Sequence, residues 1–244
     1  MIDNLAAYHF VAIDEPDAVA AWLHALAEAG ELRGTVLVAP EGINLFLAGR
    51  IEAIDALIDA VRGDARFATL QVKRSRSDAL PFARLKVKVK PEIISFRKPE
   101  AMPVAAPARA PDVAPGTLAR WITQGHDDAG KRLVLLDTRN REEFGFGTFS
   151  GALTLPIDNF TELPDALAPH REALRDAAVV SFCTGGIRCE KAAIYMNEAG
   201  IPNVYQLDGG ILKYFEETGG PGYEGKCFVF DERHSLDPGL APSK

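Results

Sequence analysis

The first hundred residues alternate between short apolar runs and segments whose apolar residues recur every three or four positions. The longer period predicts amphipathic helices, and the short runs predict strands. In chain order we expect a strand at 5–13, a helix at 15–30, strands at 34–39 and 42–49, a helix at 50–63 and a strand at 67–74. This β-α-β-β-α-β order is that of a ferredoxin-like α+β domain.

One more strand is expected at 85–90, where leucine and valine alternate with lysine, so that the lysines share one face. Residues 66–98 carry ten Lys and Arg against two acids, although the whole chain has a net charge of -7. Two interpretations remain open: lysines that protect an edge strand from pairing with another chain, or cations that contact RNA phosphates. The candidate RNA-binding residues are Lys73, Arg74, Arg84, Lys86, Lys88 and Lys90.

A proline- and alanine-rich segment at 99–113 predicts a semi-extended linker between a first domain at 1–98 and a second at 114–225. In the second domain, helical patterns alternate with continuous apolar runs such as 177–183, which are typical of buried strands. This alternation predicts an α/β domain with a central parallel sheet. Residues 226–244 form a C-terminal extension.

The stretch SFCTGGIRCEKAAIYMNEAG, residues 181–200, joins one of these buried strands to a helix. Cys183 therefore lies at the carboxyl end of a strand, where open α/β sheets bind their ligands. The glycines allow successive backbone N–H groups to face inward beside the helix N-terminus, and the arginine adds a positive charge. This setting predicts a lowered pKa for Cys183, which we take as the catalytic residue. The surrounding anion cradle comprises Thr184, Gly185, Gly186, Ile187 and Arg188.

Residues 114–217 resemble rhodanese domains. CTGGIR is similar to their six-residue active-site loop, LLDTRNREEFGFGTFSGALTLPI to their aspartate–arginine signature and the segment after it, and VYQLDGGI to their closing strand and glycine pair. Cysteine phosphatases place the arginine six positions after the cysteine, whereas Arg188 follows Cys183 by five. The shorter loop favours sulfur chemistry over the hydrolysis of phosphate esters.

From about residue 5 to residue 236 the chain resembles a narrower family, the rhodanese-domain tRNA uridine(34) hydroxylases (TrhO, formerly UPF0176). The matching motifs are PEGIN, PFARLKVKVK, FCTGGIRCEKA, LDGGILKYFEE and GKCFVFDER. The resemblance implies an oxidoreductase that converts uridine 34 in a tRNA anticodon loop to 5-hydroxyuridine, with molecular oxygen and a reductant. It also favours RNA binding by the lysine-bearing strand. A sulfurtransferase is the alternative, in which Cys183 carries a persulfide taken from a sulfur donor.

Supporting roles around Cys183 are assigned to three residues. Asp137 and Arg139 correspond to the rhodanese signature and are expected to tie the strand ends to the active loop. Glu143, four positions after Arg139, is expected to pair with it. Cys189 has two open interpretations: a small side chain near the helix start, or a second thiol that resolves an oxidised or persulfidated Cys183.

No cofactor motif stands out in the sequence. His126, Asp128 and His170 could be imagined as an iron site, but a polar, glycine-containing loop around His126 is more typical of a solvated turn. Cys227 has no companion at a metal-ligand spacing, and no flavin or dinucleotide fingerprint is present. We therefore assign no metal residues and leave the oxygen-activating group open.

Composition sets the cellular context. Three cysteines are too few for a disulfide framework, no apolar stretch is long enough to span a membrane, and the N-terminus has no signal-peptide pattern. We expect a cytoplasmic protein. Many family members continue into a cysteine-rich tail, whereas this chain ends at Lys244, so we expect it to lack any metal or RNA binding that such a tail supplies.

Overall fold

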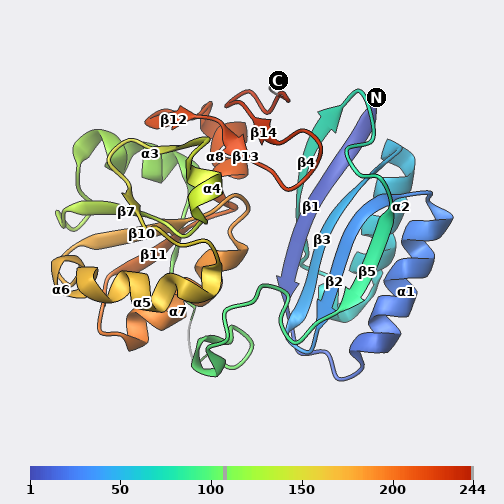
Figure 1. The fold of residues 1–244 in the computed structure, drawn as a ribbon, viewed down its shortest axis with the longest axis horizontal. Coiled ribbons are helices and arrows are strands. Elements are labelled where there is room, and N and C mark those ends of the chain that lie inside the picture. Colours follow the sequence, from blue (N-terminus) through green and yellow to red (C-terminus); the bar gives the residue numbers. More distant parts are fainter. Residues whose placement is uncertain (107–108, 243–244) are drawn as a thin grey trace. The chain divides into compact units, whose positions relative to one another are not determined.

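The computed structural model describes residues 1–106 and 109–242 and divides into two compact units (Figure 1). The first comprises Met1–Ser95 and Asp231–Arg233, and the second Phe96–Phe230 and His234–Lys244. Each unit has a five-stranded sheet of its own.

The first unit has the ferredoxin-like α+β fold with one added strand. Its elements are β1 (Ile2–Phe10), α1 (Pro16–Ala29), β2 (Arg33–Ala39), β3 (Gly42–Gly49), α2 (Ile51–Gly63), β4 (Gln71–Ser77) and β5 (Leu85–Val89). The strand order is β4-β1-β3-β2-β5, in which β5 runs parallel to β2 and the other neighbours are antiparallel. The lysine-bearing strand therefore forms an edge of the sheet.

Both helices of the first unit cover the same face of its sheet (Figure 1). Leu5 and Ala7 of β1 and Val36 and Val38 of β2 point into the core that the two helices close. Because side chains alternate along a strand, Tyr8 and the lysines of β5 belong to the opposite face.

Two strands of this unit begin at residues other than those predicted from the sequence. β1 begins at Ile2 rather than at residue 5, because its pairing with β4 extends from Tyr8 back to Ile2. β4 begins at Gln71 rather than at Phe67, because Ala65–Phe67 form a 3-10 turn. That turn is capped by Asp64, whose carboxylate accepts the backbone N–H of Arg66 at 2.9 Å, and it buries Phe67 completely.

The second unit is an α/β domain whose central sheet is all parallel, in the order β6-β11-β10-β7-β9. The strands are β6 (Asp112–Val113), β7 (Leu133–Asp137), β8 (Gly147–Phe149), β9 (Leu153–Thr154), β10 (Ala178–Phe182), β11 (Val204–Leu207), β12 (Tyr223–Gly225), β13 (Cys227–Phe228) and β14 (Ser235–Leu236). The helices are α3 (Pro115–Gln124), α4 (Arg141–Phe144), α5 (Leu163–Leu167), α6 (Arg171–Leu174), α7 (Ile187–Glu198) and α8 (Gly210–Thr218). Helices α3 and α8 cover one face of the sheet, and α5, α6 and α7 lie on the other (Figure 1).

The proline-rich segment 99–113, which was expected to be a semi-extended linker, packs as part of the second unit. Just before it, Phe96 is 1% exposed and stacks on Phe160 with ring centroids 4.6 Å apart. Arg109 donates to the buried carboxylate of Glu190 on α7 at 2.5 and 2.9 Å, and β6 joins the edge of the sheet. Proline prevents regular structure but not packing, so this segment forms part of the second unit. Residues 107 and 108 of the predicted linker lie outside the described residues.

The C-terminal extension is also structured as far as residue 242. β12 pairs with β8, and β13 pairs with β14. Between these strands, Asp231–Arg233 belong to the first unit, where the Arg233 guanidinium donates to the Ser75 hydroxyl at 2.7 Å.

Candidate active site

Cys183 follows β10, the central strand of the parallel sheet, and precedes α7. Gly186 turns the chain into the helix with φ 99° and ψ -20°, a backbone conformation that only glycine adopts readily. The Gly186 N–H points back and donates to the Cys183 sulfur at 3.1 Å. The helix begins at Ile187, so Arg188 lies in its first turn.

The pKa of Cys183 is lowered to about 5. Burial acts in the opposite direction, because the side chain is 1% exposed and a buried thiolate loses hydration. Four groups outweigh this penalty: the Cys189 thiol that donates to the sulfur, the positive charge of Arg188, and the backbone N–H groups of Arg188 and Gly186. The loop therefore holds a thiolate at neutral pH, the form that acts as a nucleophile.

Arg188 is held by Glu143 rather than by solvent. Its two terminal nitrogens each donate to one Glu143 carboxylate oxygen at 2.6 Å, and both side chains are buried. Glu143 was expected to pair with Arg139 because the two are four positions apart. It pairs instead with Arg188, through a contact between α4 and α7. The Asn140 N–H also donates to Glu143 at 3.0 Å, which fixes the carboxylate on its own short helix.

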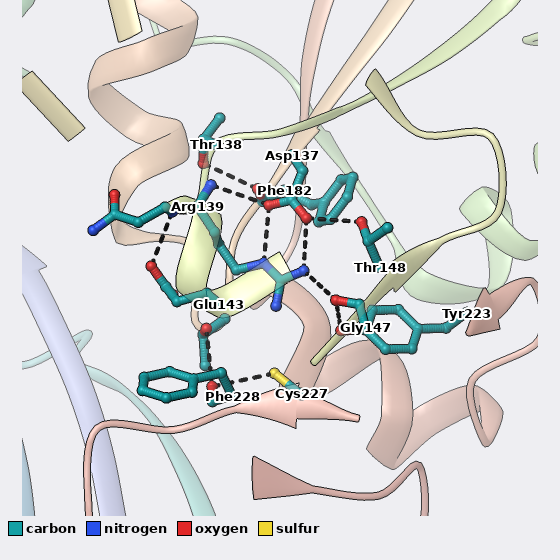
Figure 2. Close-up of polar contacts among 12 residues, drawn as sticks. Asp137, Thr138, Arg139, Glu143, Gly147, Thr148, Phe182, Tyr223, Cys227 and Phe228 are labelled. Carbon is teal, nitrogen blue, oxygen red and sulfur yellow. Dashed lines mark hydrogen bonds and ion pairs between the residues drawn. The ribbon is translucent and has the colours of Figure 1, made fainter. Parts of the chain in front are cut away.

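Asp137 and Arg139 form a second buried ion pair at the end of β7, next to β10 (Figure 2). Arg139 donates to the carboxylate at 2.9 and 2.6 Å and to the Gly147 carbonyl at 2.7 Å, while the Thr148 hydroxyl donates to the same carboxylate at 2.7 Å. Neither Asp137 nor Arg139 is exposed. These contacts tie the end of β7 to Gly147 and Thr148, and the sequence pattern did not indicate Thr148.

The glycine pair at the start of α8 fixes the other side of the loop. The N–H of Ile211 donates to the Cys183 carbonyl at 2.9 Å, and the N–H of Leu212 donates to the Thr184 carbonyl at 3.1 Å. Gly210 lies so close that a Cβ there would be 2.5 Å from the Cys183 oxygen and 2.7 Å from the Gly186 nitrogen. Only glycine leaves room for the loop at this position.

Cys189 lies under the loop and is completely buried. Burial and its hydrogen bond to the Cys183 thiolate raise the pKa of Cys189 well above its usual value, so it stays protonated. Its sulfur also lies 3.8 Å from the Thr138 hydroxyl. The Cys189 thiol thus donates a hydrogen bond to the Cys183 thiolate, and its sulfur lies next to the Cys183 sulfur.

The candidate RNA-binding residues have different surroundings within the first unit. Lys86, Lys88 and Lys90 are exposed along the edge strand and just after it, and Arg84 is exposed just before it. Arg74, by contrast, is paired with Asp3 and Asp55. The Lys73 ammonium lies 5.2 Å from the ring centroid of Tyr8. Among the six candidates, the exposed cations are therefore those on β5 and directly next to its two ends.

His126, Asp128 and His170, which were considered as an iron site, do not form a group that could hold a metal ion. Arg120 and Trp121 donate to Asp128 and lower its pKa to about 2, while His126 contacts the neighbouring Asp127 carbonyl at 2.8 Å. Within residues 1–106 and 109–242, no group of three His, Cys, Asp or Glu side chains is placed to hold a metal ion. In the same part of the chain, no helix is both long and apolar enough to cross a membrane.

The fold and the loop define the class of protein. Residues 2–93 match the UPF0176 acylphosphatase like domain, and residues 118–217 match the rhodanese-like domain. The chain is 62% identical over 99% of its length to a tRNA uridine(34) hydroxylase of Xanthomonas euvesicatoria pv. vesicatoria, of which it covers 97%. It is 57% identical to the enzyme of that name from Xylella fastidiosa, covering 99% of this chain and 93% of the other. The chain belongs to the tRNA uridine(34) hydroxylase family.

Among solved structures, a human single-domain sulfurtransferase is 28% identical, with a TM-score of 0.35, and the match covers 44% of this chain and 97% of the other. A rhodanese-like domain from Anabaena sp. is 22% identical with a TM-score of 0.38, and covers 47% of this chain and 79% of its own.

Proposed function

We propose that this protein hydroxylates uridine 34 of tRNA to 5-hydroxyuridine, in the cytoplasm, with the Cys183 thiolate as the working group. The observation that carries the proposal is the identity of 62% to a tRNA uridine(34) hydroxylase across nearly the whole of both chains. The intact loop supports it, because a thiolate with a pKa of about 5 is ready to react at neutral pH.

Hydroxylation replaces the hydrogen on C5 of uracil with a hydroxyl group, which is a two-electron oxidation. With molecular oxygen as oxidant, one oxygen atom enters the base and the other leaves as water, so an external reductant must supply two electrons and two protons. Uracil itself is a poor nucleophile at C5. A thiolate that adds to C6 makes C5 electron-rich, and C5 can then take an oxygen atom from an oxidant at the peroxide level.

The covalent route regenerates the free cysteine at its end. After C5 has bonded to oxygen, loss of the C5 proton and expulsion of the thiolate restore the double bond between C5 and C6.

In the alternative route, Cys183 carries a persulfide and transfers sulfur. The burial of Cys183 bears on this choice, since it is 1% exposed. Base addition requires the ring to displace covering side chains, whereas a persulfide extends the reactive sulfur by about 2 Å.

The RNA-binding part of the proposal assigns phosphate contacts to the edge strand β5. Lys86 and Lys88 lie on the sheet face opposite the helices, together with Tyr8. Phosphate contacts of this kind are independent of sequence and sensitive to salt. An anticodon loop presents its bases unpaired, so a protein can reach uridine 34 without opening a duplex.

The experiment that tests the proposal is nucleoside analysis of tRNA by mass spectrometry. It uses a strain that lacks the gene and every parallel route to the same nucleoside, complemented with the wild-type protein or with Cys183→Ser. We expect 5-hydroxyuridine and its derivatives with the wild-type protein and none with the variant. Full hydroxylation by Cys183→Ser would exclude both routes through the sulfur. A trapped protein–RNA adduct distinguishes base addition from the persulfide route, and thiocyanate release from thiosulfate and cyanide tests the sulfurtransferase.

A further inference from the structure

Three phenylalanine rings form a continuous row in the second unit. The rings of Phe146 and Phe228 have centroids 5.3 Å apart, and those of Phe228 and Phe230 have centroids 5.0 Å apart. Phe228 is 9% exposed, but the two outer rings are open to solvent, Phe146 at 41% and Phe230 at 58%. No other Phe, Tyr or Trp in the described part of the chain is as exposed as these two. We call Phe146, Phe228 and Phe230 the phenylalanine row.

The phenylalanine row is fixed by the same contacts that fix the active loop. The Thr184 hydroxyl donates to the Phe228 carbonyl at 3.4 Å. At one end of the row, the N–H of Phe146 donates at 3.2 Å to the carbonyl of Glu143, the residue that holds Arg188. The backbone of the phenylalanine row therefore lies next to the loop that carries Cys183.

The exposed rings contrast with the other aromatic residues of this unit. Phe149, Phe182 and Phe215 are all at most 2% exposed and pack in the core. An exposed ring gains little from the hydrophobic effect, so Phe146 and Phe230 stabilise the fold less than their buried counterparts do. Exposed aromatic side chains next to a reactive loop are instead suited to stack on a planar partner.

The chemistry of the substrate decides which partner this is. Single-stranded nucleic acids bind to proteins by stacking their bases on aromatic side chains, and this contact tolerates any base because every base has a π-face. The reacting uridine must reach Cys183, which is 1% exposed, whereas the two outer rings of the row are open to solvent. The row therefore fits a base that flanks the target. The backbone N–H of Lys226 donates to the Phe146 carbonyl at 2.9 Å and holds the chain at one end of the row.

We propose that Phe230 and Phe146 form a stacking platform for an unpaired base of the anticodon loop next to uridine 34. The identity of this RNA rests on the proposed function. The platform holds the flanking nucleotide while the loop receives the target base, and it contributes to substrate binding rather than to the chemical step.

The test uses the whole protein and an anticodon stem-loop RNA that carries 2-aminopurine in place of a base next to uridine 34. Stacking on an aromatic ring quenches the fluorescence of 2-aminopurine. We expect the wild-type protein to quench it, Phe230→Ala and Phe146→Ala to lose most of the quench and bind about 10-fold more weakly, and Phe230→Tyr to keep both properties. Ile51→Ala, at a residue of α2 that is 39% exposed, is the matched apolar control and should bind like the wild type.

The outcomes separate the platform from the proposed function. Equal affinity and equal quench for the wild type and both alanine variants would overturn the platform. So would a wild-type protein that leaves the fluorescence unchanged but self-associates through Phe230, as measured by sedimentation. Quenching that depends on Phe230, in a protein that forms no 5-hydroxyuridine in cells, would keep the platform and remove the proposed function. For an active enzyme, Phe230→Ala should raise KM and leave kcat close to its wild-type value.

Discussion

Arg188 and Glu143 face each other with two parallel hydrogen bonds of 2.6 Å, one from each terminal guanidinium nitrogen. The pair joins α7, which begins inside the active loop, to α4, which precedes the exposed Phe146. The positive charge that lowers the pKa of Cys183 is thus held in place by a carboxylate 45 residues away in the sequence.

The first prediction concerns this pair. Glu143→Gln leaves a buried guanidinium without its counter-charge, and breaking a buried pair in this way costs about 3–5 kcal/mol. We expect the free energy of unfolding to fall by about that amount in chemical denaturation. The double variant Glu143→Gln with Arg188→Gln removes both charges, so its destabilisation should be smaller than the sum for the two single variants. Additive effects would show that the two residues do not depend on each other.

The second prediction concerns the pH dependence of Cys183. Its pKa is about 5 in the folded protein and about 9 when the thiol is free. Between these values the unfolded chain binds a proton that the folded chain does not bind, so raising the pH from about 5 to about 9 stabilises the fold through this group. The stabilisation should be lost as the pH falls through about 5, and Cys183→Ser should lack it. Thiolate absorbance in the ultraviolet, followed against pH, checks the titration directly.

The third prediction separates steric contact from backbone strain at Gly210. Gly210 and Gly219 have nearly the same positive φ, 68° and 73°, but a Cβ at Gly219 would meet nothing within 4 Å. Gly219→Ala should cost only the conformational strain of about 1–2 kcal/mol. Gly210→Ala adds a collision with the backbone of the loop, so it should reduce hydroxylation strongly and raise the pKa of Cys183. Similar activities for the two variants would contradict this assignment.

The fourth prediction concerns the hydrogen bond from Cys189 to Cys183. Cys189→Ala removes a donor to the thiolate, so the pKa of Cys183 should rise above about 5. Cys189→Ser keeps a donor, so it should preserve most of the lowered pKa. If Cys189 also resolves an oxidised Cys183, both variants should lose activity faster than the wild type during exposure to peroxide. Identical titrations for the wild type and Cys189→Ala would exclude the hydrogen bond.

The fifth prediction concerns the lysines of the edge strand. Lys86→Gln combined with Lys88→Gln should weaken tRNA binding, because each variant side chain leaves one RNA phosphate without its neutralising charge. The slope of log affinity against log salt should therefore fall by about 2. Arg50→Gln is the matched control, because Arg50 is exposed but lies outside β5 and is paired with Glu31. An unchanged slope would show that the lysines only protect the edge of the sheet.

The fold follows from the sequence more directly than the surroundings of the active loop do. The order of helices and strands and the parallel sheet of the second domain were predicted from local periodicity, and the candidate cradle around Cys183 was predicted from a short motif. The partner of Arg188 could not be predicted, because α4 and α7 are far apart in the sequence and meet only in the folded domain. The need for glycine at position 210 is likewise a consequence of close approach in space. Composition was misleading for 99–113, since prolines give the same pattern in a packed segment and in a free one.

The packing of that segment decides where the catalytic half can be separated from the rest. A fragment that starts at residue 114 would lose Arg109, the counter-charge of the buried Glu190, and also Phe96, the ring stacked on Phe160. Helix α7, which carries Arg188 and Cys189, would then lose packing contacts on one side. A fragment that starts before Phe96 keeps this cover, and we expect only the longer piece to retain an ionised Cys183.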